Sequence, residues 1–214
     1  MISAAVIFAG GDRSLPDVAE EIPENALVIA ADGGYHHALE LGLQVHHLVG
    51  DFDSLEVEQV DPGVGVERHP VDKDATDLEL AMLLAERHNA ERLIIVGGHG
   101  GRLDHLLANA ALLCRDSFAR FDIEWLAGTA RLHVIRQATR LHGSVGEPVT
   151  LLAVGGIARG IETTGLAWPM TGESLEPGST RGVSNVLAAP VATVRLQEGV
   201  LLSIQPEAMS HPVR

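Results

Sequence analysis

The sequence of 214 residues has a single cysteine, Cys114, so no disulfide can form within the chain. Because disulfides are the rule in oxidising compartments, this scarcity indicates a reducing, cytoplasmic environment. Aromatic residues are almost as rare, at 3% of the chain, whereas 46% of all residues are hydrophobic. That hydrophobic content excludes a disordered protein and leaves aliphatic side chains to fill the core.

Positive charge is also scarce, with 15 Lys and Arg against 29 Asp and Glu, a net charge of −14 and a pI near 5.1. Such a chain repels phosphate backbones and anionic membranes, which argues against nucleic acid and membrane partners. The acidity has two interpretations: it keeps the protein in solution, or it gathers carboxylates around a cation. Where the carboxylates lie in the sequence decides between the two.

Several functional motifs are missing as well. No apolar run approaches the roughly 20 residues that span a bilayer, and the first ten residues, MISAAVIFAG, predict a strand in place of a signal peptide. The chain has no GxxxxGK[ST] phosphate loop, no GxGxxG after its first strand, no HExxH and no cysteine cluster. Cys114 falls in an apolar helical pattern and is a poor candidate nucleophile.

The pattern of hydrophobic residues changes near Gly128. Before it, expected strands at 4–9, 26–30, 47–49, 66–69 and 92–96 alternate with expected helices at 16–21, 35–41, 77–88 and 103–118. Thr76 and Glu79 form a capping box at the start of the clearest helix. This alternation predicts a Rossmann-like parallel sheet with helices on both faces in a domain of residues 1–128.

After Gly128 the helical period stops. Short runs rich in β-branched residues predict strands at 131–136, 148–153, 159–163, 190–196 and 200–204, separated by Gly and Pro. The expected second domain, residues 129–214, is small, all-β and sandwich-like. The fold class is therefore α/β followed by an all-β domain.

Glycine, aspartate or both follow every predicted strand of the first half at its carboxyl end. The segments are GGD at 10–12, DGG at 32–34, GDFDS at 50–54, DKDATD at 72–77 and GGHGGRLDH at 97–105. Ligands of open α/β sheets bind beyond this edge. Converging carboxylates repel each other unless a cation joins them, and Mg²⁺ takes one or two carboxylates together with phosphate oxygens. The placement indicates phosphate chemistry with Mg²⁺.

Taken singly, each segment has a plainer explanation. Asp51 and Asp53 lie on the same side of an extended backbone and can share one cation, but a solvated turn has the same composition. Asp77 gains from the helix dipole in the first turn of a helix. The glycines at 97–101 either approach phosphates closely or form a flexible loop, and Arg102 beside them favours phosphate binding.

The motifs together resemble the thiamine pyrophosphokinase family. The signatures occur in the family's order: ADGG at 31–34, GDFDS at 50–54, KDATD at 73–77, GGRLDH at 100–105 followed by Asn109, and GLAWP at 165–169 preceding GVSN at 182–185. The resemblance extends over residues 31–203. It implies transfer of the diphosphate of ATP to the hydroxyethyl oxygen of thiamine, with release of AMP.

The resemblance also assigns roles to residues. It implies that Asp51, Asp53 and Asp77 form the metal and phosphate centre. On the ATP side it implies Asp32, Lys73, Asp74, Arg102, Asp104, His105 and Asn109, and on the thiamine side Trp168, Ser184 and Asn185. It further implies a homodimer whose sites are shared between chains. Lys73 stands where animal members carry a different polar residue, and the loop at 172–181 is specific to this chain, which leaves nucleotide preference and the contacts of the thiamine loop open.

Two other functions compete with this one. In a haloacid-dehalogenase-like phosphatase, Asp51 would be the nucleophile of an Asp-x-Asp motif, but that family gives no account of residues 182–185 or of the β domain. A thiamine or nucleotide sensor would keep the fold without turnover. The presence of every candidate acidic residue argues against a sensor.

Overall fold

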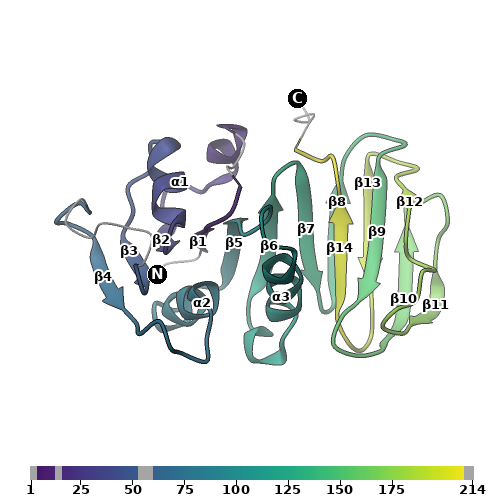
Figure 1. Cartoon of the computed structure of the whole chain (residues 1–214). Helices are drawn as coiled ribbons and strands as arrows, with labels where there is room; N and C mark the ends of the chain where they lie inside the picture. The colour runs from purple at the N-terminus through teal and green to yellow at the C-terminus, as the bar shows by residue number, and fades with distance from the viewer. Residues whose placement is uncertain (1–3, 13–15, 53–59, 210–214) are drawn as a thin grey trace. The chain divides into compact units, whose positions relative to one another are not determined.

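The computed structural model describes residues 4–12, 16–52 and 60–209. The chain forms two compact units (Figure 1). Unit 1 comprises Met1–Leu112 and Arg120–Gly128, and unit 2 comprises Leu113–Ala119 and Thr129–Arg214.

Unit 1 is built on parallel strands. They are β1 (Ala4–Ala9), β2 (Leu27–Ala31), β3 (His47–Gly50), β4 (Gly65–Arg68), β5 (Arg92–Gly97) and β6 (Asp122–Ala127). All pair in parallel, in the order β4-β3-β2-β1-β5-β6. Because the order of connection reverses between β1 and β5, the carboxyl ends of these two strands mark the place where an open sheet binds its ligand.

Short helices connect these strands. They are the 3₁₀ helix η1 (Pro16–Glu21), α1 (Gly34–Glu40), α2 (Asp77–Arg87), α3 (Leu103–Leu113) and the 3₁₀ helix η3 (Asp116–Phe118) of unit 2. Thr76 caps α2 as expected, since its side chain accepts a hydrogen bond from the backbone N–H of Glu79. The face of α2 formed by Leu78, Met82 and Ala85 is buried against the sheet.

The prediction of one helix over 103–118 is wrong. Helix α3 ends at Leu113, and Arg115 has an extended backbone with φ −63° and ψ 144°. The guanidinium of Arg136 donates hydrogen bonds to the carbonyls of Cys114 and Arg115, at 2.9 and 2.8 Å. These contacts satisfy carbonyls that a continuing helix would have paired.

Unit 2 consists of antiparallel strands in two sheets. One has the order β12 (Asn185–Val186), β9 (Pro148–Ala153), β14 (Leu201–Gln205), β7 (Ala130–Ile135); the other has the order β11 (Thr171–Leu175), β10 (Ala158–Thr164), β13 (Val191–Arg195), β8 (Ala138–His142). Buried side chains of both sheets, such as Leu151 and Leu201 from one and Ile161 and Val194 from the other, form a single core.

The structure confirms a mixed α/β protein with a mostly parallel sheet and a separate antiparallel sheet. It adds strands that the sequence analysis missed, namely β6, β8, β11 and β12. No helix in the described ranges is long and apolar enough to cross a membrane.

Candidate active site at the carboxyl ends of the parallel strands

A cavity of about 540 Å³ opens at the carboxyl ends of β1, β2 and β5. Its lining comes from the loops after these strands, from the segment before α2 and from the first turns of α3. Among the residues predicted for the site, the cavity wall includes Asp32, Lys73, Asp77, Arg102, His105 and Asn109. The structure thus brings three separate motifs to the switch point of the parallel sheet.

An ammonium group lies between two carboxylates at this edge. Lys73 Nζ is 2.8 Å from Asp51 Oδ2 and 3.1 Å from Asp77 Oδ1. The side chains of Lys73 and Asp51 are only 13% and 14% exposed. The sequence analysis assigned Lys73 to the ATP side. In the structure its ammonium group directly contacts two carboxylates of the expected metal centre.

Asp32 belongs to the same cluster. A Cβ atom on Gly50 would stand 3.3 Å from both Asp32 Cβ and Asp77 Oδ1, so the ends of β2 and β3 and the start of α2 converge. Burial raises the pKa of the Asp77 carboxyl; Lys73 opposes this rise, while the charges of Asp51 and Asp32 add to it. Burial works to lower the pKa of Lys73, but its hydrogen bonds to Asp51 and Asp77 raise it above the ordinary value. One ammonium therefore faces several carboxylates, and the cluster attracts cations.

The donor chemistry of this cluster fits Mg²⁺, which prefers hard carboxylate oxygens and completes its shell with water or phosphate. Within residues 4–12, 16–52 and 60–209, no group of three or more His, Cys, Asp or Glu side chains stands at metal-binding spacing. Asp53, the third predicted ligand, lies outside the described residues. The expected extended backbone between Asp51 and Asp53 is wrong at Phe52, where φ is +59°.

The glycine-rich loop after β5 packs closely against the loop after β1. A Cβ atom on Gly11, whose φ is +111°, would stand 2.2 Å from the carbonyl oxygen of His99, so only glycine fits there. The Asn109 amide donates to the carbonyl of Gly98 at 2.9 Å, and the buried indole of Trp125 donates to the carbonyl of Gly97 at 2.7 Å. These two bonds hold the base of the loop, so Asn109 positions backbone as well as lining the cavity.

The remaining residues on the ATP side are more exposed. Arg102 lines the cavity, and its guanidinium donates to both carboxylate oxygens of Asp104, at 3.2 and 2.6 Å. The hydrogen bond from Arg102 lowers the pKa of Asp104 to about 2. Asp74 is exposed and lies outside the cavity lining, as does Asp104.

The cavity lining also includes side chains that the sequence analysis did not propose for the site. Among them, His99 lines the cavity from within the glycine-rich loop, and Val71 from the segment before Lys73. The sequence could have indicated His99, because it lies between two pairs of glycines in a loop that is expected at the switch point.

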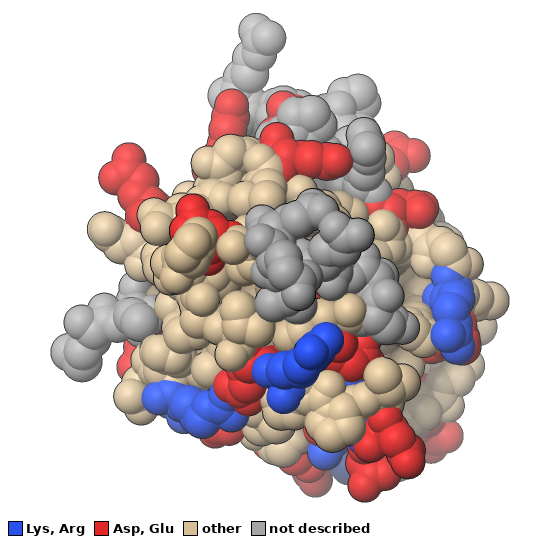
Figure 2. All heavy atoms as spheres, turned by 60° about the vertical axis from the view of Figure 1, so that its left-hand side comes forward, with Lys and Arg blue, Asp and Glu red and all other residues tan. Residues whose placement is uncertain are grey.

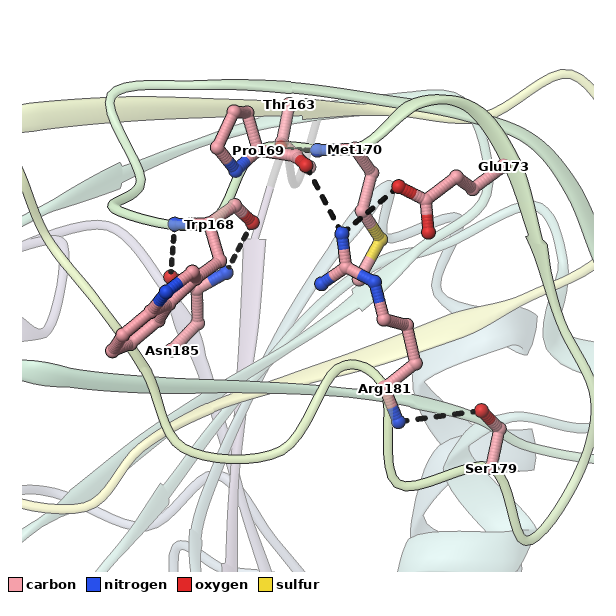
Figure 3. A network of polar contacts seen from close by, with 8 residues as sticks. All are labelled: Thr163, Trp168, Pro169, Met170, Glu173, Ser179, Arg181 and Asn185. Atoms are coloured by element: carbon pink, nitrogen blue, oxygen red, sulfur yellow. Dashed lines mark hydrogen bonds and ion pairs between the residues drawn. The ribbon is translucent and has the colours of Figure 1, made fainter.

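Of the residues predicted for the thiamine side, Trp168 and Asn185 lie side by side in unit 2 (Figure 3). Trp168 is 56% exposed, whereas Asn185 is only 2% exposed. Asn185 Oδ1 accepts from the backbone N–H of Trp168 at 3.1 Å, and Asn185 Nδ2 donates to the carbonyl of Trp168 at 2.7 Å. The amide of Asn185 therefore holds the backbone of Trp168. Ser184 is exposed beside it.

Backbone strain concentrates in the motifs. Among the described residues, the non-glycine residues with positive φ are Asp32 (44°), Phe52 (59°), Ser184 (58°) and Asn89 (58°). The first three lie in three different signatures, whereas Asn89 follows the end of α2. Strain of this kind persists where the fold enforces it, and it clusters at functional sites.

Comparison with known proteins assigns this arrangement to a family. Residues 18–124 match the model of the thiamin pyrophosphokinase catalytic domain, and residues 132–201 match that of the thiamin pyrophosphokinase vitamin B1 binding domain. The chain belongs to the thiamine pyrophosphokinase family. The members of this family are transferases that make thiamine diphosphate from thiamine and ATP.

Thiamine pyrophosphokinases of known sequence or structure match over nearly their full length. A curated thiamine pyrophosphokinase of Bacillus subtilis (strain 168) is 26% identical over 208 residues, covering 93% of this chain and 96% of that protein. The crystal structure of the enzyme from Bacillus subtilis matches with a TM-score of 0.83 at 26% identity, over 94% of this chain and 98% of that one. That from Geobacillus thermodenitrificans matches with a TM-score of 0.80 at 30% identity, over 94% and 96%.

Proposed function

We propose that the cavity of unit 1 binds ATP with Mg²⁺, and that its residues perform the diphosphate transfer of the thiamine pyrophosphokinase family. The observation that carries this proposal is the cluster of Asp32, Asp51, Lys73 and Asp77 beside a cavity large enough for a nucleotide, at the switch point of the sheet. The strand order β4-β3-β2-β1-β5-β6 supports a Rossmann-like arrangement for this unit.

In this proposal, Asp51, Asp53 and Asp77 hold Mg²⁺, which when bound neutralises charge on the phosphate oxygens. Lys73 adds a positive charge at the same edge, and Arg102 provides a forked donor for phosphate oxygens at the start of α3. Backbone N–H groups of the loop at 97–101 approach the phosphates, and Asn109 fixes that loop.

The reaction forms a bond between the thiamine hydroxyl oxygen and the β-phosphorus, and it breaks the bond from the β-phosphorus to the oxygen bridging it to the α-phosphorus. AMP leaves with that oxygen, and one of the cleft carboxylates accepts the hydroxyl proton. Asp32, Asp74, Asp104 and His105 surround the nucleotide in this proposal. The protein supplies alignment and charge, which are the main contributions to catalysis of phosphoryl transfer.

Thiamine binds against Trp168 and Ser184 in unit 2, and Asn185 acts by holding Trp168. The exposed indole offers a flat surface for an aromatic cation. The acidic surface supports the same substrate, because thiamine carries a permanent positive charge. Figure 2 shows acidic side chains spread widely over one face of the molecule, with the basic groups lying beside acidic ones.

The proposed enzyme is a cytoplasmic homodimer, with unit 2 of one chain completing the cavity of unit 1 of the other. Helix α3 supports this assembly, because Leu103 and Leu107, one turn apart, are 67% and 63% exposed on the helix that carries His105 and Asn109 at the cavity. Exposed leucines beside a ligand cavity are typical of a surface that another chain covers.

One assay tests the function. Purified protein is incubated with Mg²⁺, ATP and thiamine, and the products are identified by mass spectrometry. AMP and thiamine diphosphate in equal amounts are expected. Phosphate released from a phosphomonoester would support a phosphatase instead, and thiamine binding without product would support a sensor.

A further inference from the structure

The turn that presents Trp168 is held at its tip by side chains. Before the tip, backbone pairing fixes the chain: Ala167 N–H donates to the carbonyl of Val186 at 3.0 Å, and Leu166 bridges Leu187. From Trp168 onward side chains contact the turn as well (Figure 3), and backbone pairing resumes where Thr163 N–H donates to the carbonyl of Met170 at 2.9 Å. Asn185 binds both backbone groups of Trp168, and the Thr163 hydroxyl accepts from Met170 N–H at 2.8 Å.

The carbonyl between these contacts belongs to Pro169, and it is bound by an arginine from another segment. Arg181 Nη2 donates to the Pro169 carbonyl at 3.1 Å and to Glu173 Oε1 at 2.9 Å (Figure 3). Glu173 lies on β11, and Arg181 lies before β12. One guanidinium therefore ties the Trp168–Pro169 turn to two further segments.

The loop that carries Arg181 is itself ordered by short-range contacts. Ser179 N–H donates to the carbonyl of Glu176 at 2.9 Å, and the Ser179 hydroxyl accepts from Arg181 N–H at 3.3 Å. At the end of the loop, a Cβ atom on Gly182 would stand 2.2 Å from the Leu151 carbonyl oxygen, so the chain is pressed against β9. Arg181 thus projects from a fixed base, as a positioning device requires.

We propose that Arg181, held by Glu173, is a positioning residue that fixes the orientation of Trp168 for the thiamine substrate. Asn185 fixes the carbonyl of Trp168, and Arg181 fixes the next carbonyl, that of Pro169. Two successive carbonyls are therefore restrained, and with them the backbone that carries the indole. Lysine is not an equivalent replacement for this arginine, because the planar Nη2 group directs its two N–H bonds in fixed directions toward the Pro169 carbonyl and Glu173, whereas an ammonium rotates freely. The proposal rests on the assignment of thiamine to Trp168 in the proposed function.

Tryptophan fluorescence tests the positioning directly. The chain has two tryptophans, and Trp125 is buried, so acrylamide quenching and fast anisotropy decay report mainly on Trp168. A Trp168→Phe protein supplies the Trp125 signal for subtraction. We expect Arg181→Ala, Arg181→Lys and Glu173→Gln to increase the local mobility of Trp168. The matched control is Arg159→Ala, which removes the exposed Arg159–Glu198 pair of the same unit and leaves the signal unchanged.

Steady-state kinetics tests the consequence for the substrate. Loss of one charge-assisted hydrogen bond is expected to raise the KM for thiamine about fivefold in Arg181→Ala, with the KM for ATP and the melting temperature unchanged. Unchanged Trp168 mobility, or equal defects for ATP and thiamine, would overturn the positioning role. An unchanged KM for thiamine in Trp168→Ala would instead overturn the thiamine assignment itself, so the two failures are distinguishable.

Discussion

The aspartates of the cleft lower the stability of the fold. Asp32, Asp51 and Asp77 converge on a partly buried edge, and Lys73 is the cation that the structure shows among them. Asp32 also has a φ of 44°, which an L-residue adopts only under constraint. Groups that repel each other and strain the backbone do not stabilise a protein, so their arrangement supports the proposed catalytic role.

Replacing one of these carboxylates separates activity from stability. We expect Asp77→Asn to lower kcat by about 10²–10³-fold, because one of the carboxylates proposed to hold Mg²⁺ is lost. The melting temperature will stay the same or rise, since one of several repelling charges is removed. Kinetics and calorimetry on the same preparation check this. A melting temperature that falls in proportion to activity would show a structural role for Asp77.

Ser184 allows a similar test at a strained backbone position. Ser184 has a φ of 58°, so Ser184→Gly removes the steric penalty of a Cβ atom in the folded state but gives the unfolded chain more conformational freedom. These two effects oppose each other, so the free energy of unfolding will change by less than about 1 kcal/mol. The KM for thiamine will rise if the exposed hydroxyl meets the substrate. Asn89→Gly, at φ 58° after α2, is the matched control with unchanged kinetics. A large loss of stability in urea would assign Ser184 to the fold alone.

At the level of the elements, local signals were predictable and contacts between strands were not. The Thr76 cap follows from residues three apart, and the structure shows it. Strand β6 escaped prediction because Glu124 interrupts its apolar run. Glu124 is buried yet satisfied, since Arg92 on β5 lies 2.7 Å away. Such a partner comes from a distant segment and leaves no trace in the local pattern.

In the candidate site, too, local features were predictable from the sequence and contacts between distant segments were not. Glycines and aspartates after the strands were visible, because strand ends in a parallel sheet meet at one edge. The bridge from Lys73 to Asp51 and Asp77 was not, because it depends on how the loop before α2 folds. The burial of Asn185 was equally hidden, since its partner Trp168 lies 17 residues away in the chain.

Histidines at the junction of β3 and α2 give the fold a sensitivity to acid. The rings of His47 and His88 are 4.8 Å apart, with His46, Glu67 and Arg87 as charged or titratable neighbours. Burial lowers the pKa of His47; His88, His46 and Arg87 lower it further, and Glu67 opposes them. Because the unfolded chain then binds a proton more readily, stability is complete above about pH 6.5 and is lost as pH falls toward the folded-state pKa.

We therefore expect His47→Gln to lose less stability than the unmodified protein between pH 7.5 and pH 5. Urea unfolding at both values measures the difference, and His142→Gln, an exposed histidine on β8, serves as the control. The same loss of stability in His47→Gln and in the unmodified protein would exclude His47 as the origin of the acid sensitivity.

At the scale of the whole molecule, the net charge of −14 favours binding of both substrates only if acidic and basic side chains are placed separately on the surface. A negative surface attracts cationic thiamine, which speeds encounter at low salt, but it repels free ATP. In the proposed function, the positive charges of Lys73 and Arg102 at the cavity, together with Mg²⁺, offset this repulsion. The division of acidic and basic groups matches a protein that must bind two substrates of opposite charge.

Mixing two defective variants tests whether the proposed dimer shares its sites. Asp77→Asn damages the cavity of unit 1 and Asn185→Ala the thiamine side of unit 2, so each variant alone is poorly active at low thiamine. If unit 2 of one chain completes the cavity of its partner, half of randomly exchanged dimers are mixed and carry one intact site of two. Activity should then recover to about one quarter of the unmodified enzyme, as isologous pairing requires. A chain bearing both substitutions, mixed with either variant, is the control and will not recover. Light scattering that shows a monomer at assay concentration, or no recovery after verified exchange, would place both halves of the site in one chain.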